Sequence, residues 1–234
     1  MMLPNLNHSG ITTGHDTGRG SGIIDTHNFP IIIDAIGLFS SSESWKKSDE
    51  VAIKQWFEAY LNWLMTSKNG IHESKTSGNH KTYYDNQIAT ISLFCGKKEG
   101  AQKVLENAKS LIASQIESNG EQPNELVRTL GLGYSTFNLK ALFFLATVAE
   151  TQGIDLWNYQ TTDGRSIRKA LDYLLPYVVG GKKWPHQQIG PYKTRDYFRL
   201  LMIAASKFKD DTYKIQAEKI RDNNTNLFIE LLNG

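Results

Sequence analysis

The sequence predicts an all-α protein. Apolar side chains recur at helical spacing along most of the 234 residues, with glycines and prolines between the periodic segments. No stretch alternates β-branched and polar residues between hairpin turns, as β-strands would. Consecutive helices of about 14 to 20 residues joined by short and medium loops favour antiparallel hairpins. Periodicity leaves open whether these hairpins form a bundle, a solenoid or an α/α toroid.

The N-terminal part is expected to differ from the rest. Residues 1–22 contain five glycines among Ser, Thr, His and Asn without any period, and they are expected to form a loop segment. Residues 23–234 are expected to form the helical domain. Ser48 is predicted to cap a helix with Asp49 and Glu50 in its first turn. The core-facing residues of that helix are predicted to be Ile53, Trp56, Phe57, Tyr60, Leu61 and Leu64.

Two helices are expected in the middle of the chain. The first runs from about Lys81 to Cys95, and the second is expected to stop at Gly120. Their apolar stripes consist of Tyr84, Ile88 and Ile91 in the first and of Val104, Leu105, Ala108, Leu111, Ile112 and Ile116 in the second.

Four more helices are expected after these. Ser135 is predicted to open the first, and the turn Asp163-Gly164 leads into the second, which Pro176 and Gly180-Gly181 should end. The expected bounds are Ser135 to Gly153, about Ile167 to Pro176, Arg195 to Phe208 and Tyr213 to Leu232.

Composition limits the possible partners. The 26 Lys and Arg residues nearly balance the 24 Asp and Glu residues, so no global positive field would attract nucleic acid, and an acidic ligand would need a local basic patch. Cys95 is the single cysteine, which excludes an internal disulfide, and we expect it in the core near a helix end. The histidines are not spaced as metal ligands, so neither a metal nor a cofactor is predicted. No apolar run of about 18 residues is evident, so no membrane span is predicted.

A first polar cluster lies around Asn79 and His80, just before a predicted helix. Backbone N–H groups and the positive end of the helix dipole stabilise anions at such a position. Tyr84 follows closely and is expected to contact a bound ligand. The alternative is that Asn79 only caps the helix and His80 is a surface residue.

A second polar group consists of Arg128 and Tyr134. Either these residues take part in catalysis, or they are structural. In the structural alternative, Arg128 forms hydrogen bonds at a helix C-terminus and Tyr134 only packs against neighbouring residues. Breaking a polymer beside a uronic acid requires three tasks, which are neutralising the carboxylate, removing the C5 proton and protonating the departing O4. Asn, Arg and His suit the first task, and Tyr or His suits the others. Because two such groups occur in one chain, the residues suggest a polysaccharide lyase.

A third candidate segment is Lys183–Gln188. Trp184 offers a stacking platform for a sugar ring, and His186 and Gln187 offer hydrogen bonds. The alternative is an inter-helix loop whose Trp184 fills a gap. No pair of carboxylates stands out, which disfavours a hydrolase that uses two acids.

The sequence resembles the alginate lyase superfamily of α/α-toroid polysaccharide lyases from about Gly18 to the C-terminus. The resemblance extends over several segments rather than one motif. These are Gly22–Thr26, Ile33–Leu38, Trp56–Leu64, Gly78–Gln87, Tyr134–Leu139, Asp155–Tyr159 and Trp184–Ile189.

The resemblance implies roles for the two polar groups. Asn79 and His80 match the family's Asn-His pair, which implies that Asn79 helps to neutralise the uronate carboxylate and that His80 acts there or as a base. Arg128 and Tyr134 match the family's Arg and Tyr, so Tyr134 is implied as acid and, for mannuronate, also as base. Arg128 is implied to stabilise the Tyr134 phenolate and to bind the carboxylate. The implied substrate is an acidic polysaccharide or oligosaccharide, alginate above all.

The chain also departs from the family. Members are longer and begin with an export signal and further helices, so these 234 residues are expected to be a C-terminal portion that forms an incomplete (α/α) toroid. Family members imply a periplasmic or secreted location, whereas the sequence as written begins without a signal peptide, as a cytoplasmic protein would. The alternative function is that of an inactive or truncated relative that binds saccharide or serves as a helical scaffold.

Overall fold

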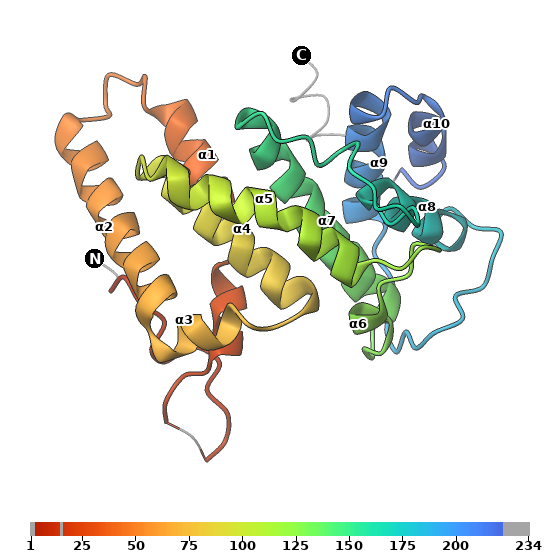
Figure 1. Ribbon diagram of the computed structural model, residues 1–234, viewed down its shortest axis with the longest axis horizontal. Helices are drawn as coiled ribbons and strands as arrows, with labels where there is room; N and C mark the ends of the chain where they lie inside the picture. Colours follow the sequence, from red (N-terminus) through yellow and green to blue (C-terminus); the bar gives the residue numbers. More distant parts are fainter. Residues whose placement is uncertain (1–2, 15, 222–234) are drawn as a thin grey trace. The chain divides into compact units, whose positions relative to one another are not determined.

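The computed structural model describes residues 3–14 and 16–221 (Figure 1). Within these residues every regular element is helical, apart from an isolated β-bridge between Leu130 and Gln188, so the all-α prediction is confirmed. The elements are the 3-10 helix η1 (Gly20–Thr26) and the α-helices α1 (Phe29–Phe39), α2 (Lys47–Thr66), α3 (Lys68–Glu73), α4 (Gly78–Phe94), α5 (Lys98–Gln115), α6 (Pro123–Leu126), α7 (Gly131–Thr151), α8 (Ile167–Val178), α9 (Arg195–Lys207) and α10 (Thr212–Glu218).

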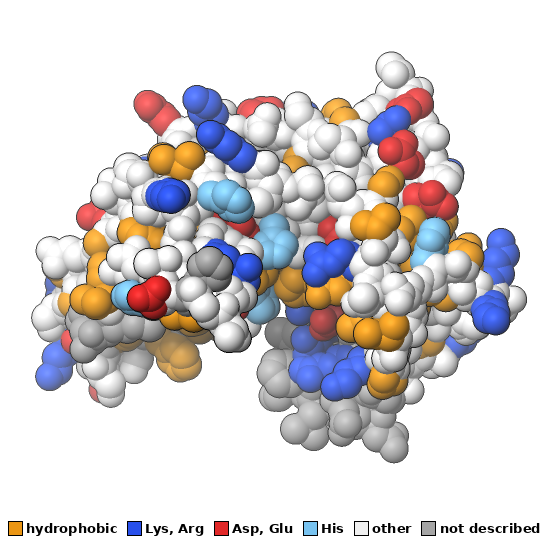
Figure 2. Space-filling view, turned by 90° about the horizontal axis from the view of Figure 1, so that it is seen from below, with side chains coloured by type: hydrophobic (Ala, Val, Ile, Leu, Met, Phe, Trp, Pro, Cys, Tyr) orange, Lys and Arg blue, Asp and Glu red, His pale blue; other side chains and the backbone are white. Residues whose placement is uncertain are grey.

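The chain divides into two compact units. Unit 1 comprises Met1–Ala108 with Thr147–Ile154, and unit 2 comprises Lys109–Ala146 with Asp155–Gly234. The sequence predicts instead a loop segment over residues 1–22 and a helical domain over residues 23–234, and this division stays a prediction. Charged side chains of both signs are distributed over the face drawn in Figure 2, which agrees with the nearly balanced composition.

The core of unit 1 forms where α2, α3 and η1 meet α4, and where α1 packs on α4. The predicted stripe of α2 lies in this core, and each fully buried Leu or Phe side chain contributes roughly 1.5 to 3 kcal/mol. Cys95 is buried at the C-terminal end of α4, as expected, and burial raises the pKa of its thiol to about 11. The buried members of the core cluster are Ile23, Ile33, Ile36, Phe57, Tyr60, Leu61, Leu64, Tyr84, Ile88, Ile91 and Cys95.

A buried polar network fastens η1 to α2 and α4. Thr26 Oγ1 lies 2.8 Å from Gln87 Oε1 and 2.7 Å from the Tyr60 hydroxyl, while Gln87 Nε2 donates to the carbonyl oxygen of Ile23 at 3.4 Å. All three side chains are inaccessible or nearly so. Because an unpaired polar group at this depth would cost about 1 to 3 kcal/mol, the network fixes where the N-terminal loop joins the helices.

Two helix ends in the first half differ from the prediction. Helix α2 begins at Lys47, and Asp49 Oδ2 accepts the backbone N–H of Lys46 at 3.3 Å, so Ser48 lies inside the helix and is not its cap. Helix α5 ends at Gln115, before the predicted stop at Gly120. The apolar stripe of α5 is nevertheless buried as predicted, with Val104 partly buried.

Helix α7 also begins earlier than predicted, at Gly131 instead of Ser135, and ends at Thr151, two residues before Gly153. By length and composition this helix could cross a membrane, which corrects the expectation that no such segment is present. However, 67% of its most apolar window is buried inside the structure. A buried core helix explains the same composition.

The C-terminal helices follow the prediction more closely. Ser166 caps α8 by accepting the backbone N–H of Lys169 at 3.1 Å, and α8 continues through Pro176 to Val178, since a proline in the last turn removes a single hydrogen bond. Helix α9 has the predicted bounds to within one residue. Helix α10 ends at Glu218, so that helix is shorter than predicted, and residues 222–232 of the predicted helix lie outside the described residues.

Substituting Gly120 with Ala should destabilise the protein strongly. Gly120 has φ +95°, and a Cβ atom there would lie 2.3 Å from the carbonyl oxygen of Lys169. Gly164 has φ +88° but open space around its Cα, so it is a matched control. We expect Gly164→Ala to cost about 1 kcal/mol from backbone strain alone and Gly120→Ala about 3 kcal/mol or more. Urea unfolding measures both, and equal losses would contradict the close contact at Gly120.

Candidate active site

The first polar group is positioned by the start of α4. Gly78 opens this helix with φ +63°, a conformation that favours glycine, after an extended Ser77. The sharp change of direction brings Asn79 and His80 into the first turn of α4, whereas the sequence analysis placed them just before the helix. Asn79 is buried, and the His80 side chain keeps 26% of its surface exposed. His80 is therefore the member of this pair that a ligand can reach.

His80 is held by a buried carboxylate. Glu73, the last residue of α3, is 1% exposed, and its Oε1 lies 2.6 Å from His80 Nδ1. A carboxylate can only accept here, so Nδ1 carries the proton of this bond and Nε2 is left for a ligand. The second oxygen, Oε2, is buried and has no hydrogen-bond partner among the described residues. Glu73 was not predicted as a site residue. The sequence around it does not distinguish a glutamate on the surface from one that is buried against a histidine.

Tyr84, which is predicted to contact a ligand, lies in the core of unit 1. Its side chain is 6% exposed within the core of unit 1, and its hydroxyl donates to the carbonyl oxygen of Leu64 at 3.0 Å. Burial, with the nearby carboxylates of Asp85 and Glu73, raises the pKa of Tyr84 to about 12. The phenol is enclosed and already hydrogen-bonded as a core residue, and its contact with a ligand stays a prediction. The predicted apolar stripe that contains Tyr84 is confirmed.

A buried ion pair follows His80 on α4. Lys81 pairs with Asp85 one turn later, and both side chains are largely shielded from water. Burial raises the pKa of the Asp85 carboxyl, while Lys81 opposes that rise. The pair occupies Lys81, so this lysine is not the local basic patch that an acidic ligand would need.

The second polar group lies in unit 2. Arg128 follows the short helix α6, and its backbone N–H donates to the carbonyl oxygen of Glu125 at 3.1 Å. Its guanidinium carbon lies 4.0 Å from the ring centroid of Tyr134, which is a close cation–π contact. Both side chains are half-buried. The structure thus brings together the Arg and Tyr that the sequence analysis singled out.

Tyr134 is positioned by a segment far along the chain. Gln188 Oε1 accepts the backbone N–H of Leu132 at 3.1 Å, and the carbonyl oxygen of Gln187 accepts that of Gly131 at 2.9 Å. These acceptors satisfy N–H groups that the first turn of α7 would otherwise leave free. Gln188 therefore caps α7 and allows Tyr134 to lie in its first turn. The sequence analysis proposed Gln187 as a ligand contact and did not identify this role of Gln188.

Trp184 and His186 lie within an aromatic cluster of unit 2. The ring centroid of Trp184 lies 5.0 Å from that of Tyr177 and 5.1 Å from that of His186, each in an edge-on arrangement. His186 Nε2 lies 3.3 Å from the hydroxyl of Tyr173. This packing agrees with the alternative in which Trp184 fills a gap beside the helices. The Gln187 residue is exposed, and its role as a ligand contact stays a prediction.

The structure thus assembles two groups, His80 with Asn79 and Glu73 in unit 1, and Arg128 with Tyr134 in unit 2. In the described part of the chain, no three His, Cys, Asp or Glu side chains gather in a way that could hold a metal ion. The two groups provide an imidazole, a phenol, an amide and a guanidinium as reactive side chains.

Comparisons with known proteins agree on one family. The model of the alginate lyase family matches residues 1–184. An alginate lyase from Bacteroides ovatus, known from a crystal structure, superposes with a TM-score of 0.93 at 32% sequence identity, and the match covers 100% of this chain and 63% of that one. No protein in a search of curated sequences matches this chain significantly.

Two more distant structures share the fold. A histidine-to-alanine variant of alginate lyase A1-III complexed with a tetrasaccharide gives a TM-score of 0.63 at 17% identity, covering 80% of this chain and 56% of that one. The apo form of that variant gives a TM-score of 0.60 at 16% identity, and the match covers 76% of this chain and 51% of that one. The chain thus spans less than two thirds of the length of each of these proteins. Since the family model matches well over half of the sequence, the chain belongs to the alginate lyase family.

Proposed function

We propose that the chain is a polysaccharide lyase that cleaves a uronic-acid polymer, with alginate as its substrate, by β-elimination. The observation that carries this proposal is the guanidinium of Arg128 held 4.0 Å from the ring centroid of Tyr134. The contact places a permanently charged guanidinium beside the phenol that we propose transfers the proton. Membership of the alginate lyase family and the likeness to the Bacteroides ovatus alginate lyase support the choice of substrate.

In the sugar, the elimination breaks the C5–H and C4–O4 bonds and forms the C4–C5 double bond and an O4–H bond. The C5–H bond breaks first, and the resulting charge spreads into the adjacent carboxylate, which must be neutralised. The electron pair then forms the C4–C5 double bond as the C4–O4 bond breaks, and O4 receives a proton. The Tyr134 oxygen takes the C5 proton from mannuronate and returns a proton to O4, so it ends the cycle in the protonation state in which it began.

The remaining residues stabilise the charged intermediate. Arg128 binds the uronate carboxylate through its planar donors. His80 belongs to the separate group of unit 1, where Glu73 holds the ring through Nδ1. Its Nε2 removes the C5 proton as a base, or donates to a uronate carboxylate when the ring carries both protons. Asn79, which is buried in the same turn of α4, supports the position of His80.

The test is incubation with polymers rich in mannuronate, in guluronate and in glucuronate, followed by the absorbance of unsaturated uronate ends. We expect a steady gain with mannuronate-rich alginate. No gain on any of the three polymers would reject the proposal. Saccharide binding without turnover, unchanged in Tyr134→Phe, would instead identify an inactive relative that binds saccharide.

A further inference from the structure

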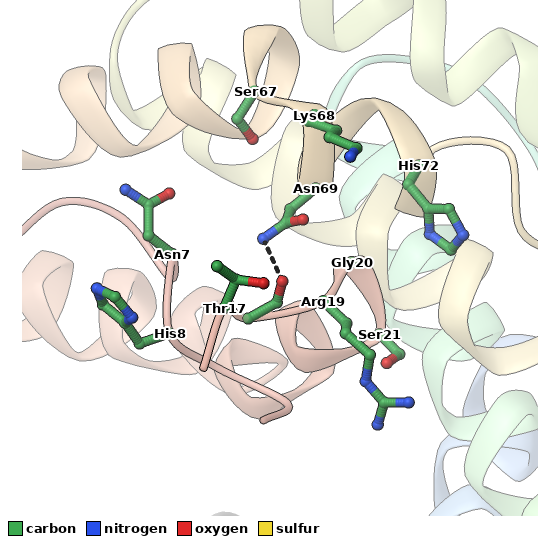
Figure 3. A pocket seen from close by; sticks show the side chains of 11 residues that line it. Asn7, His8, Thr17, Arg19, Gly20, Ser21, Ser67, Lys68, Asn69 and His72 are labelled. Carbon is green, nitrogen blue, oxygen red and sulfur yellow. Dashed lines mark hydrogen bonds between the residues drawn. The ribbon is translucent and has the colours of Figure 1, made fainter. Parts of the chain in front are cut away.

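Unit 1 contains a cavity of about 790 Å3 that the proposed reaction does not use. Residues of the N-terminal loop form one wall, and the junction of α2 with α3 forms the other (Figure 3). This volume lies in the range of about 300 to 1,000 Å3 that small-molecule sites occupy. The cavity is therefore large enough to hold a ligand.

The lining of the cavity is basic. Arg19 and Lys68 contribute two cations, and His8 and His72 add two imidazole rings, whereas no described Asp or Glu lines the cavity. Lys68 forms no ion pair with the described residues, and Arg19 uses only Nε, which donates to the carbonyl oxygen of Gly10 at 2.8 Å. In a chain with nearly balanced charge, this is a local positive patch. Such a patch attracts an anion.

The walls of the cavity are fixed before any ligand binds. Asn7 Oδ1 accepts the indole N–H of Trp63 on α2 at 2.8 Å, and Asn69 Nδ2 donates to the carbonyl oxygen of Gly18 at 3.4 Å (Figure 3). A Cβ atom on Gly20 would lie 2.6 Å from His72 Nδ1, so glycine allows the loop to approach α3 this closely. Preformed walls reduce the ordering cost of binding.

The cavity also adjoins the proposed catalytic histidine through α3. This six-residue helix supplies Lys68, Asn69 and His72 to the cavity and Glu73 to His80. A ligand bound in the cavity would thus touch the same short helix that orients the His80 ring.

We infer that this cavity binds a uronate residue of the polymer, with Lys68 and Arg19 holding its carboxylate. The inference rests on the proposed function for the identity of the sugar. Arg and Lys both form charge-assisted hydrogen bonds with carboxylates. Asn69 and Asn7 are placed to bond the ring hydroxyls.

The test is a calorimetric titration with trimannuronate, using protein that carries Tyr134→Phe so that the sugar is not consumed. Lys68→Gln and Arg19→Gln should each raise Kd about tenfold, which is the usual effect of losing one charge-assisted hydrogen bond. Lys98→Gln removes the same charge from an exposed site outside the cavity and should leave Kd unchanged. Neutral mannotriose should bind at least about tenfold more weakly than trimannuronate.

Several outcomes separate this inference from the proposed function. If Lys68→Gln and Arg19→Gln both keep the parent Kd for trimannuronate, the inference is overturned, even where polymer cleavage is normal. If inorganic phosphate binds in a Lys68-dependent way and trimannuronate does not, the cavity is an anion site for another ligand and the inference is again overturned. Binding of trimannuronate that depends on Lys68, in a protein that cleaves no polymer, would uphold the cavity and reject the lyase.

Discussion

Tyr134→Phe is expected to lower the turnover of mannuronate-rich alginate by about two orders of magnitude or more, the usual effect of removing a general acid or base. Phenylalanine keeps the ring that faces the Arg128 guanidinium at 4.0 Å, so packing and the cation–π contact persist. The substitution therefore removes the hydroxyl and little else. The thermal midpoint should change little, and initial rates of unsaturated-end formation measure the loss.

Tyr159→Phe is the matched control, because it removes a phenol of unit 2 outside both polar groups. We expect it to keep normal turnover. Near-normal turnover of Tyr134→Phe would show that its hydroxyl does not transfer the proton. A similar loss in both variants would point to a general effect on folding.

His80→Ala is expected to reduce turnover by a similar factor of about one hundred or more. The imidazole is the reachable group of its cluster, with 26% of its side chain exposed, and alanine offers neither a proton nor a donor for the carboxylate. Glu73→Gln should cost less, roughly tenfold, because an amide oxygen can still accept from Nδ1 but carries no charge.

Replacing Glu73 with alanine distinguishes a role in positioning the His80 ring from a purely structural role. Nitrogen NMR of the His80 ring should show the proton on Nδ1 in the parent protein, because Glu73 Oε1 lies 2.6 Å from that atom. Glu73→Ala should leave a mixture of both tautomers together with reduced turnover. Loss of turnover with an unchanged tautomer would contradict the positioning role, and normal turnover of His80→Ala would remove His80 from the reaction.

The helix interiors could be predicted from the sequence because burial of one face leaves a periodic pattern. The stripes of α2, α4 and α5 end up in the core as expected. The same logic explains the burial of Tyr84, whose place in the apolar stripe predicts a core position. Burial of this stripe in the core determined where the Tyr84 side chain lies.

The start of α7 was harder to predict because a distant residue sets it. The first turn of α7 is stabilised by Gln188, which lies 56 residues after Leu132, so Ser135 was chosen as a cap where none was needed. The pairing of His80 with Glu73 likewise depends on the turn between α3 and α4. The pairing of Arg128 with Tyr134 was expected from the family resemblance, and the local contact agrees with it.

The most direct test of the lyase chemistry is mass spectrometry of the oligosaccharides released from mannuronate-rich alginate in water enriched in heavy oxygen. Elimination adds no water, so the account predicts products that carry an unsaturated end, weigh one water molecule less than hydrolysis products and contain no heavy oxygen. Products with saturated ends that incorporate heavy oxygen would show hydrolysis and would contradict the β-elimination mechanism.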